Sequence, residues 1–135
     1  MSEELKEELS LLPKGLLHLE AGIQSLREPV LEKSRRMGKL SDALDGLRFL
    51  CALPNMETHA DLIAGLPLYH LHEIFEDVRT LAEYAAGEIQ LESLKLLPGT
   101  EMRRRAEESG IKYSPLPPYE VLQTHEINVS ELQTA

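Results

Sequence analysis

Three strand-like segments alternate with helical segments along this chain, and this alternation constrains the fold more than any other feature. The strand-like segments are residues 16–21, 56–64 and 89–97, whose starts lie about 30 to 40 residues apart. Segments with apolar residues at helical spacing, such as Ile74 and Val78, separate them. Parallel strands need a crossover of about a dozen or more residues, which is usually a helix. The alternation therefore predicts an α/β fold of βα units on a parallel sheet of about three strands.

The chain divides into a leading helix, a central region of βα units and a Pro-rich tail. The leading helix is residues 1–13, the βα units are residues 14–110, and the tail at 111–135 is expected to be extended and irregular. We expect one domain, because 135 residues fit a domain of ordinary size. Helices are expected at residues 3–12 and 29–37, after an N-cap at Ser41, from Ile74 to Ala85, and at 101–109 between Thr100 and Gly110. A last helix is expected to start at Ser130, and a short edge strand is expected near 121–127.

Composition excludes several classes of function. The chain is 42% hydrophobic and 27% charged, which is typical of a globular protein. Its formal net charge of −9 argues against nucleic-acid binding through phosphate contacts. No apolar run has membrane length and no signal-peptide pattern is present, so we expect no membrane partner and a cytoplasmic location.

Polar residues follow the strand-like segments at positions where parallel sheets bind ligands. Gln24 follows the first segment, Asp61 lies near the end of the second, and Pro98 and Gly99 follow the third. In parallel α/β folds, ligands bind at the C-terminal ends of the strands. Polar residues are also common at strand ends simply because loops begin there, so a purely structural interpretation remains open.

Several motifs, taken in order, resemble one enzyme superfamily. They are "GIQSLREPVLEKSRRMGK" from Gly22, "DLIAGLP" from Asp61, "LLPGTEMRRRAEESGIKY" from Leu96 and "PPYEVLQT" from Pro117. In this order and at these spacings they resemble the second half of the partial (β/α) barrel of radical S-adenosylmethionine (radical SAM) enzymes. The last motif is similar to the tail of a cobalamin-domain-bearing branch. The resemblance covers about residues 16–132.

The resemblance implies cofactor contacts at four positions. Gln24 and Asp61 match strand-end residues that contact the ribose or methionine end of SAM in the oxygen-independent coproporphyrinogen oxidase branch, and Ser25 completes the Gln-Ser motif. Arg36 matches an arginine that pairs with the SAM carboxylate, with Arg35 as its rival. A guanidinium offers a fork of donors that fits a carboxylate.

The chain departs from the family in the part that would carry the chemistry. Radical SAM enzymes hold a [4Fe–4S] cluster through a Cys-x3-Cys-x2-Cys loop, whereas this chain has a single cysteine, Cys51, within a helical pattern. The first three barrel strands are also absent. The resemblance therefore implies an open slice of a barrel, inactive alone, whose partner is the missing N-terminal half. SAM, the cluster and cobalamin would belong to the parent enzyme.

Two other interpretations of the chain stay open. One is a free-standing, non-catalytic binding or assembly module derived from such a barrel, and the other is an unrelated (β/α) enzyme fragment whose motifs match by coincidence. Either way, an open slice exposes strand edges and, we expect, an apolar inner face, so the isolated chain is predicted to self-associate.

The remaining polar features have competing interpretations. Gln90, Glu92 and Lys95 lie in the third strand-like segment and face either a substrate cavity or solvent. His70 and His72 are two residues apart, do not share a helical face and have no third ligand nearby, so we expect no metal site. The basic triplet 103–105 is flanked by glutamates, which favours a solvated helix face.

Overall fold

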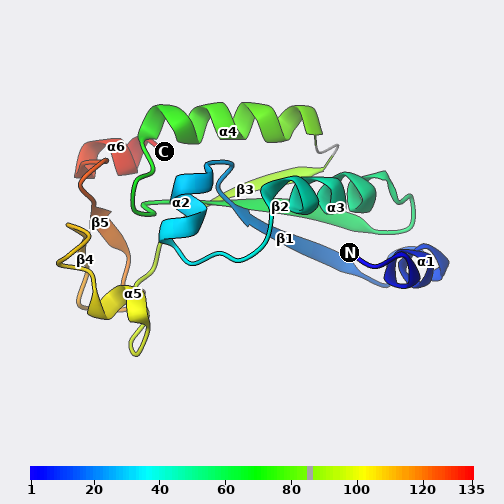
Figure 1. Ribbon diagram of the computed structural model, residues 1–135, viewed down its shortest axis with the longest axis horizontal. Helices are drawn as coiled ribbons and strands as arrows, with labels where there is room; N and C mark the ends of the chain where they lie inside the picture. Colours follow the sequence, from blue (N-terminus) through cyan, green and yellow to red (C-terminus); the bar gives the residue numbers. More distant parts are fainter. Residues whose placement is uncertain (85–86) are drawn as a thin grey trace.

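The protein folds around a three-stranded parallel sheet, as the alternation predicts. The computed structural model describes residues 1–84 and 87–135. The sheet contains β1 (His18–Gln24), β2 (Glu57–Ala64) and β3 (Glu88–Ser93) in the order β1-β2-β3, so neighbours in sequence are neighbours in space (Figure 1). The helices are α1 (Glu3–Leu11), α2 (Glu28–Lys33), α3 (Leu40–Ala52), α4 (Leu71–Tyr84), α5 (Glu101–Arg104) and α6 (Val129–Thr134).

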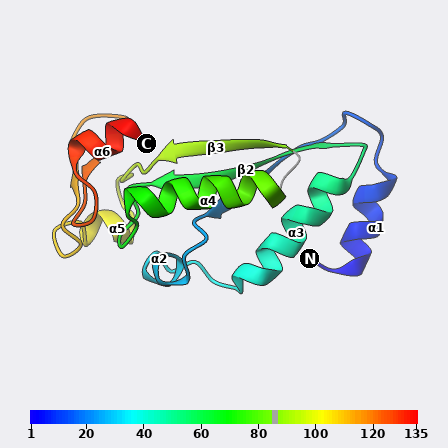
Figure 2. The ribbon, with the colours of Figure 1, turned by 90° about the horizontal axis from the view of Figure 1, so that it is seen from above.

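Helices α3 and α4 lie on the same side of the sheet (Figure 2). Their apolar stripes meet the apolar positions of the strands, because side chains alternate between the two faces of a strand with a period of two. Ala60 and Leu62 of β2 are fully buried against Leu47 of α3 and Leu81 of α4. Ile23 of β1 joins the same cluster. This packing determines which side chains are left on the opposite face.

The opposite face of the sheet is polar, and we call it the open face. None of the helices described in residues 1–84 and 87–135 lies over it. By alternation from Ala60 and Leu62, it carries His59 and Asp61 of β2, and register places Glu20 of β1 beside His59 and Gln90 of β3 beside Asp61. The expectation of an apolar inner face was therefore wrong, because most apolar positions of the three strands pack against the helices.

The C-terminal part of the chain is more ordered than an extended tail. Strands β4 (Lys112–Tyr113) and β5 (Val121–Gln123) form a two-stranded antiparallel sheet, and with α5 and α6 they lie at the C-terminal ends of β2 and β3 (Figure 1). Gly65, which follows β2 with a positive φ of 94°, comes close to Val121 and Leu132. This end of the sheet is thus closed by the chain's own tail.

Several element boundaries differ from the sequence-based expectation. Helix α2 ends at Lys33 instead of residue 37, because Arg35 turns the backbone to a positive φ of 56°. Helix α3 begins at Leu40, so Ser41 lies inside it and is not its cap. Strand β3 ends at Ser93, and Lys95 lies beyond it in an isolated bridge to Glu120.

The predicted helix cap at Thr100 and the glycine turn at Gly110 are confirmed. Thr100 caps α5 by accepting a hydrogen bond from the Arg103 backbone N–H at 3.3 Å, although the α-helix ends at Arg104. Gly110 adopts the positive φ expected of it. Ala85 lies outside the described residues. No helix among the described residues is long and apolar enough to cross a membrane.

Candidate functional site

Two of the predicted site residues, Asp61 and Arg36, lie beside Gly22. It lies in β1 directly opposite Asp61 of β2, and Asp61 in turn lies opposite Gln90 of β3. Gln24 ends β1 two residues later with a positive φ of 70°, and the register of β1 against β2 shifts between Gly22 and Gln24. The bulge and the left-handed turn bring the chain out of the sheet at the strand end where ligands bind in parallel sheets.

Arg36 approaches the same glycine from the free edge of β1. Its guanidinium donates a hydrogen bond to the Gly22 carbonyl oxygen. The two lie in a groove of about 370 Å³ whose lining includes Arg35 and Lys39. Arg35 pairs with Glu101 at 3.7 Å instead. Of the two rival arginines, Arg36 is therefore the one that contacts β1.

Ser25 lies beneath the sheet edge rather than on the open face. It is fully buried, and its hydroxyl donates to Oδ2 of Asp77 at 3.4 Å. The same oxygen accepts the Leu26 backbone N–H at 2.8 Å and the Tyr69 hydroxyl at 2.6 Å, while Oδ1 accepts Arg27 Nε at 2.9 Å. Burial, and then the contact with Asp77, raises the pKa of Tyr69. This network anchors the turn that follows Gln24.

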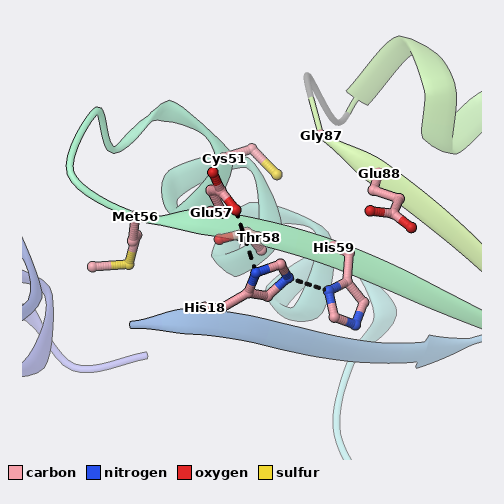
Figure 3. A pocket seen from close by; sticks show the side chains of 8 residues that line it. All are labelled: His18, Cys51, Met56, Glu57, Thr58, His59, Gly87 and Glu88. Atoms are coloured by element: carbon pink, nitrogen blue, oxygen red, sulfur yellow. Dashed lines mark hydrogen bonds and ion pairs between the residues drawn. The ribbon is translucent and has the colours of Figure 1, made fainter. Parts of the chain in front are cut away.

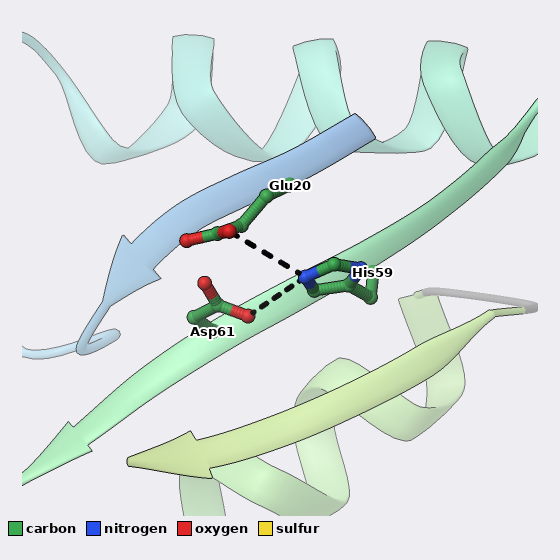
Figure 4. A group of neighbouring side chains, drawn as sticks. All are labelled: Glu20, His59 and Asp61. Atoms are coloured by element: carbon green, nitrogen blue, oxygen red, sulfur yellow. Dashed lines mark ion pairs between the residues drawn. The ribbon is translucent and has the colours of Figure 1, made fainter. Parts of the chain in front are cut away.

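Three side chains converge on the open face, and we call Glu20, His59 and Asp61 the open-face cluster (Figure 4). Nε2 of His59 lies 3.6 Å from Oδ1 of Asp61 and 3.8 Å from Oε2 of Glu20. Asp61 is only 7% exposed, and its Oδ1 is buried without a hydrogen-bond partner among the described residues. Burial, together with the neighbouring Glu20 carboxyl, raises the pKa of Asp61 to about 6.

The other nitrogen of His59 belongs to a chain of contacts along β1 and β2. His59 Nδ1 lies 2.8 Å from His18 Nε2, and His18 Nδ1 lies 3.4 Å from the Glu57 carboxylate (Figure 3). These residues line a hollow of about 270 Å³ near the start of β2. Sequence reasoning missed His18, Glu20 and His59. Their signal was present, because positions 18 and 20 of β1 and 57, 59 and 61 of β2 alternate with apolar or small residues.

The three predicted cavity residues take different positions. Gln90 and Glu92 lie on the open face of β3, where Gln90 is half-buried and Glu92 is exposed. Lys95 lies past the end of the strand and its Nζ is 3.4 Å from the Glu92 carboxylate. This pair is exposed on both sides, so it contributes little to stability by itself.

The remaining polar motifs have structural roles. His70 contacts the Glu73 carboxylate through both its backbone N–H and its Nδ1. Arg104 and Arg105 pair with Glu101 and Glu108, as expected for a solvated helix face. Arg103 differs, because its guanidinium stacks against the rings of Tyr113 and Tyr119 and donates to the Leu96 carbonyl oxygen at 3.0 Å. It therefore ties α5 to the β4–β5 region.

Comparison with known proteins assigns this chain to no family. A scan against protein-family models found no match. A search of curated proteins found no relative either. The function of the chain is therefore inferred from the motifs in its sequence and from the geometry of the open face.

Proposed function

We propose that this chain is the C-terminal portion of a radical-SAM-type (β/α) barrel and supplies part of its SAM and substrate cavity. The observation that carries the proposal is the position of Asp61 and Arg36 beside Gly22, two residues before Gln24. Asp61 lies opposite Gly22 in the sheet, Gln24 lies two residues along the same strand, and Arg36 donates to the Gly22 carbonyl. Asp61 comes from β2 and Arg36 from the segment after α2, so strand pairing and the turn after α2 bring both of them to Gly22.

The chemistry of these side chains fits the polar groups of SAM. The Arg36 guanidinium uses one N–H on Gly22, which leaves donors of its fork for a carboxylate. Asp61 carries a buried oxygen that has no hydrogen-bond partner among residues 1–84 and 87–135, and a ribose hydroxyl would donate to that carboxylate. Gln24 can both donate and accept. Ser25 would act indirectly, since its hydroxyl holds the turn that carries Gln24.

The chain's residues do not fit an iron–sulfur cluster. Cys51 is the only cysteine, and it packs against the apolar cluster between α3 and the sheet. Clusters of this kind are held by several cysteine thiolates. We therefore assign no step of a reaction to a cluster in this chain. In the parent enzyme, the cluster and SAM would supply hydrogen-atom abstraction, with cobalamin in the cobalamin-bearing branch.

The open face supports the assignment of a cavity wall. Its carboxylates, histidines and Gln90 extend across all three strands, while the apolar core lies on the other side. Inward-facing polar side chains are what a barrel needs where its interior holds a polar ligand. The partner that would cover this surface is the N-terminal half of the barrel. Gln90, Glu92 and Lys95 would then face substrate.

The alternative is a non-catalytic binding or assembly module with the same ancestry. One observation favours it: three buried clusters pack within the described residues and the tail closes the end of the sheet, so the chain has an extensive core of its own. The size of the native product separates the two proposals. An immunoblot band several times 15.2 kDa would support the barrel, and a band near 15.2 kDa would support the module.

SAM binding to the isolated chain tests the cavity wall directly. We expect SAM, titrated into ¹⁵N-labelled protein, to shift the amide signals of Gly22, Gln24 and Asp61 with an affinity in roughly the millimolar range, because half of the contacts are missing. Arg36→Ala should abolish the shifts, whereas the matched variant Arg35→Ala should retain them. Shifts scattered over the surface, or equal effects of the two variants, would contradict the proposal.

A further inference from the structure

We propose that the open-face cluster of Glu20, His59 and Asp61 is a binding site for a divalent transition-metal cation of the zinc type. The inference does not rest on the proposed function, because it arises from the donor geometry of these three side chains. Only Asp61 is shared with the proposed SAM wall. Glu20 and His59 belong to none of the motifs that carry the resemblance.

The spacing of the donor atoms matches the space around a small cation. Zinc binds histidine nitrogen and carboxylate oxygen at about 2.0–2.2 Å, so tetrahedral ligands lie about 3.4 Å apart. His59 Nε2 lies 3.6 Å from Asp61 Oδ1 and 3.8 Å from Glu20 Oε2. All three donor atoms lie within 4.8 Å of one another. The Glu20 side chain is 68% exposed, so its carboxylate can move the few tenths of an ångström that coordination of the ion needs.

The hydrogen-bond chain behind His59 presents the correct nitrogen to the cation. If His18 Nδ1–H donates toward Glu57, then His18 Nε2 is the acceptor for His59 Nδ1–H. His59 Nε2 then carries a lone pair and faces the two carboxylates. Metal-binding histidines almost always donate their other N–H in this way, which fixes the tautomer and raises the basicity of the ligand.

The carboxylate of Asp61 supplies an independent observation. Asp61 is only 7% exposed to solvent, and its Oδ1 has no hydrogen-bond partner among the described residues. Buried carboxylate oxygens are normally satisfied by a donor or a cation. Asp61 Oδ1 and Glu20 Oε2 lie 3.6 Å and 3.8 Å from His59 Nε2, beyond hydrogen-bond length, so these two gaps fit a shared ion better than direct contacts.

The donor set also narrows the choice of ion. Zinc accepts imidazole nitrogen and carboxylate oxygen as ligands, and manganese or iron(II) can bind the same donors. Three protein ligands leave a further coordination position, and it would point away from the helices, over the open face. The site therefore has the composition of a centre that can bind a water molecule or a ligand group.

Calorimetric titration of the full chain with Zn²⁺, and with Co²⁺ read by its absorption spectrum, tests the site. We expect one ion per chain and a tetrahedral or five-coordinate cobalt spectrum. His59→Gln should abolish binding, and His18→Gln should weaken it about 10- to 100-fold through loss of orientation. His70→Gln is the matched control, because it removes an exposed histidine that contacts Glu73 instead. Its affinity should equal that of the wild type.

A second measurement uses the unmodified chain and is independent of variant folding. Addition of Zn²⁺ should move the imidazole ¹⁵N signal of His59 Nε2 and leave those of His70, His72 and His125 in place. Absence of zinc binding, binding that moves another histidine, or unchanged affinity in His59→Gln would each overturn the proposal. His59→Gln keeps Gln24, Arg36 and Asp61, so loss of zinc binding with retained SAM shifts would separate this site from the proposed function.

Discussion

Replacement of Asp77 by asparagine should destabilise the chain strongly, because one buried carboxylate organises the turn after β1. Asp77 is 2% exposed and accepts hydrogen bonds from Ser25, Leu26, Arg27 and Tyr69. Three of these donors share Oδ2, and the fourth uses Oδ1. An asparagine can keep its oxygen at only one of the two positions, so its NH₂ group must face a donor at the other.

The expected loss of stability comes from the ion pair with Arg27 and from the other hydrogen bonds that Asp77 accepts. Removing one partner of a buried ion pair costs about 3–5 kcal/mol. Arg27 is 32% exposed and keeps its contact with Glu76 at 2.6 Å, which lowers the expected cost. We therefore expect Asp77→Asn to lower the free energy of unfolding by about 2–4 kcal/mol. With a urea m-value of about 1.5 kcal/mol/M, the midpoint should fall by about 1.3–2.7 M.

Urea unfolding monitored by circular dichroism measures this change, and Glu76→Gln is the matched control. Glu76 contacts the same arginine but is exposed, so its replacement should cost no more than about 1 kcal/mol. The amide signals of Gln24 and Ser25 should broaden or shift in Asp77→Asn and stay in place in Glu76→Gln. Equal midpoints for the two variants would refute the argument that the Asp77 network holds this turn.

Three further predictions follow from the core, the open face and the sheet edges. With the pKa of Asp61 at about 6 when folded against 3.8 when unfolded, its contribution to stability is present below about pH 4 and is lost as the pH rises through 6. Without added metal, Asp61→Asn should therefore raise the free energy of unfolding at pH 7 by up to about 3 kcal/mol and by little at pH 4, and a wild-type advantage at pH 7 would contradict this. Gly87→Ala should lower the free energy of unfolding by about 1–3 kcal/mol in thermal unfolding, because the new Cβ would collide with the Thr58 carbonyl oxygen. Gly46→Ala, inside α3, should raise the free energy of unfolding by about 0.5–1 kcal/mol. The reverse order of the two effects would disprove the packing at Gly87. The chain should self-associate in light scattering through the free edges of β1 and β3, and a monodisperse monomer would count against it.

Part of the candidate site could be anticipated from strand periodicity and motif order. Gln24 was expected at a strand tip, and it ends β1. Gln90 and Glu92 were expected to face either a cavity or solvent, and both lie on the open face. Ser25 belongs to the same motif as Gln24, but its hydroxyl turns under the sheet to Asp77, fifty-two residues away in sequence. No local sequence pattern predicts a hydrogen-bond partner so far away along the chain.

The charged segments show the same limit. Three consecutive arginines look alike in sequence, yet Arg103 is stacked between two tyrosines while Arg104 and Arg105 pair with glutamates on the surface. The difference arises because, of the three consecutive positions at the end of α5, only that of Arg103 faces the β4–β5 region. The direction of that face depends on where the tail packs, which is a tertiary property.

Sequence alone determined which residues of each strand share a face and where helices separate the strands, because periods of two and 3.6 are properties of the local backbone. Only the tertiary structure decided which of those residues become neighbours. His18 lies beside His59, and Glu20 lies near Asp61, because helices α3 and α4 pack across the strands and set the register of β1 against β2. A shift of one residue in that register would place different side chains on the open face. The open-face cluster is therefore a product of packing on the opposite side of the sheet.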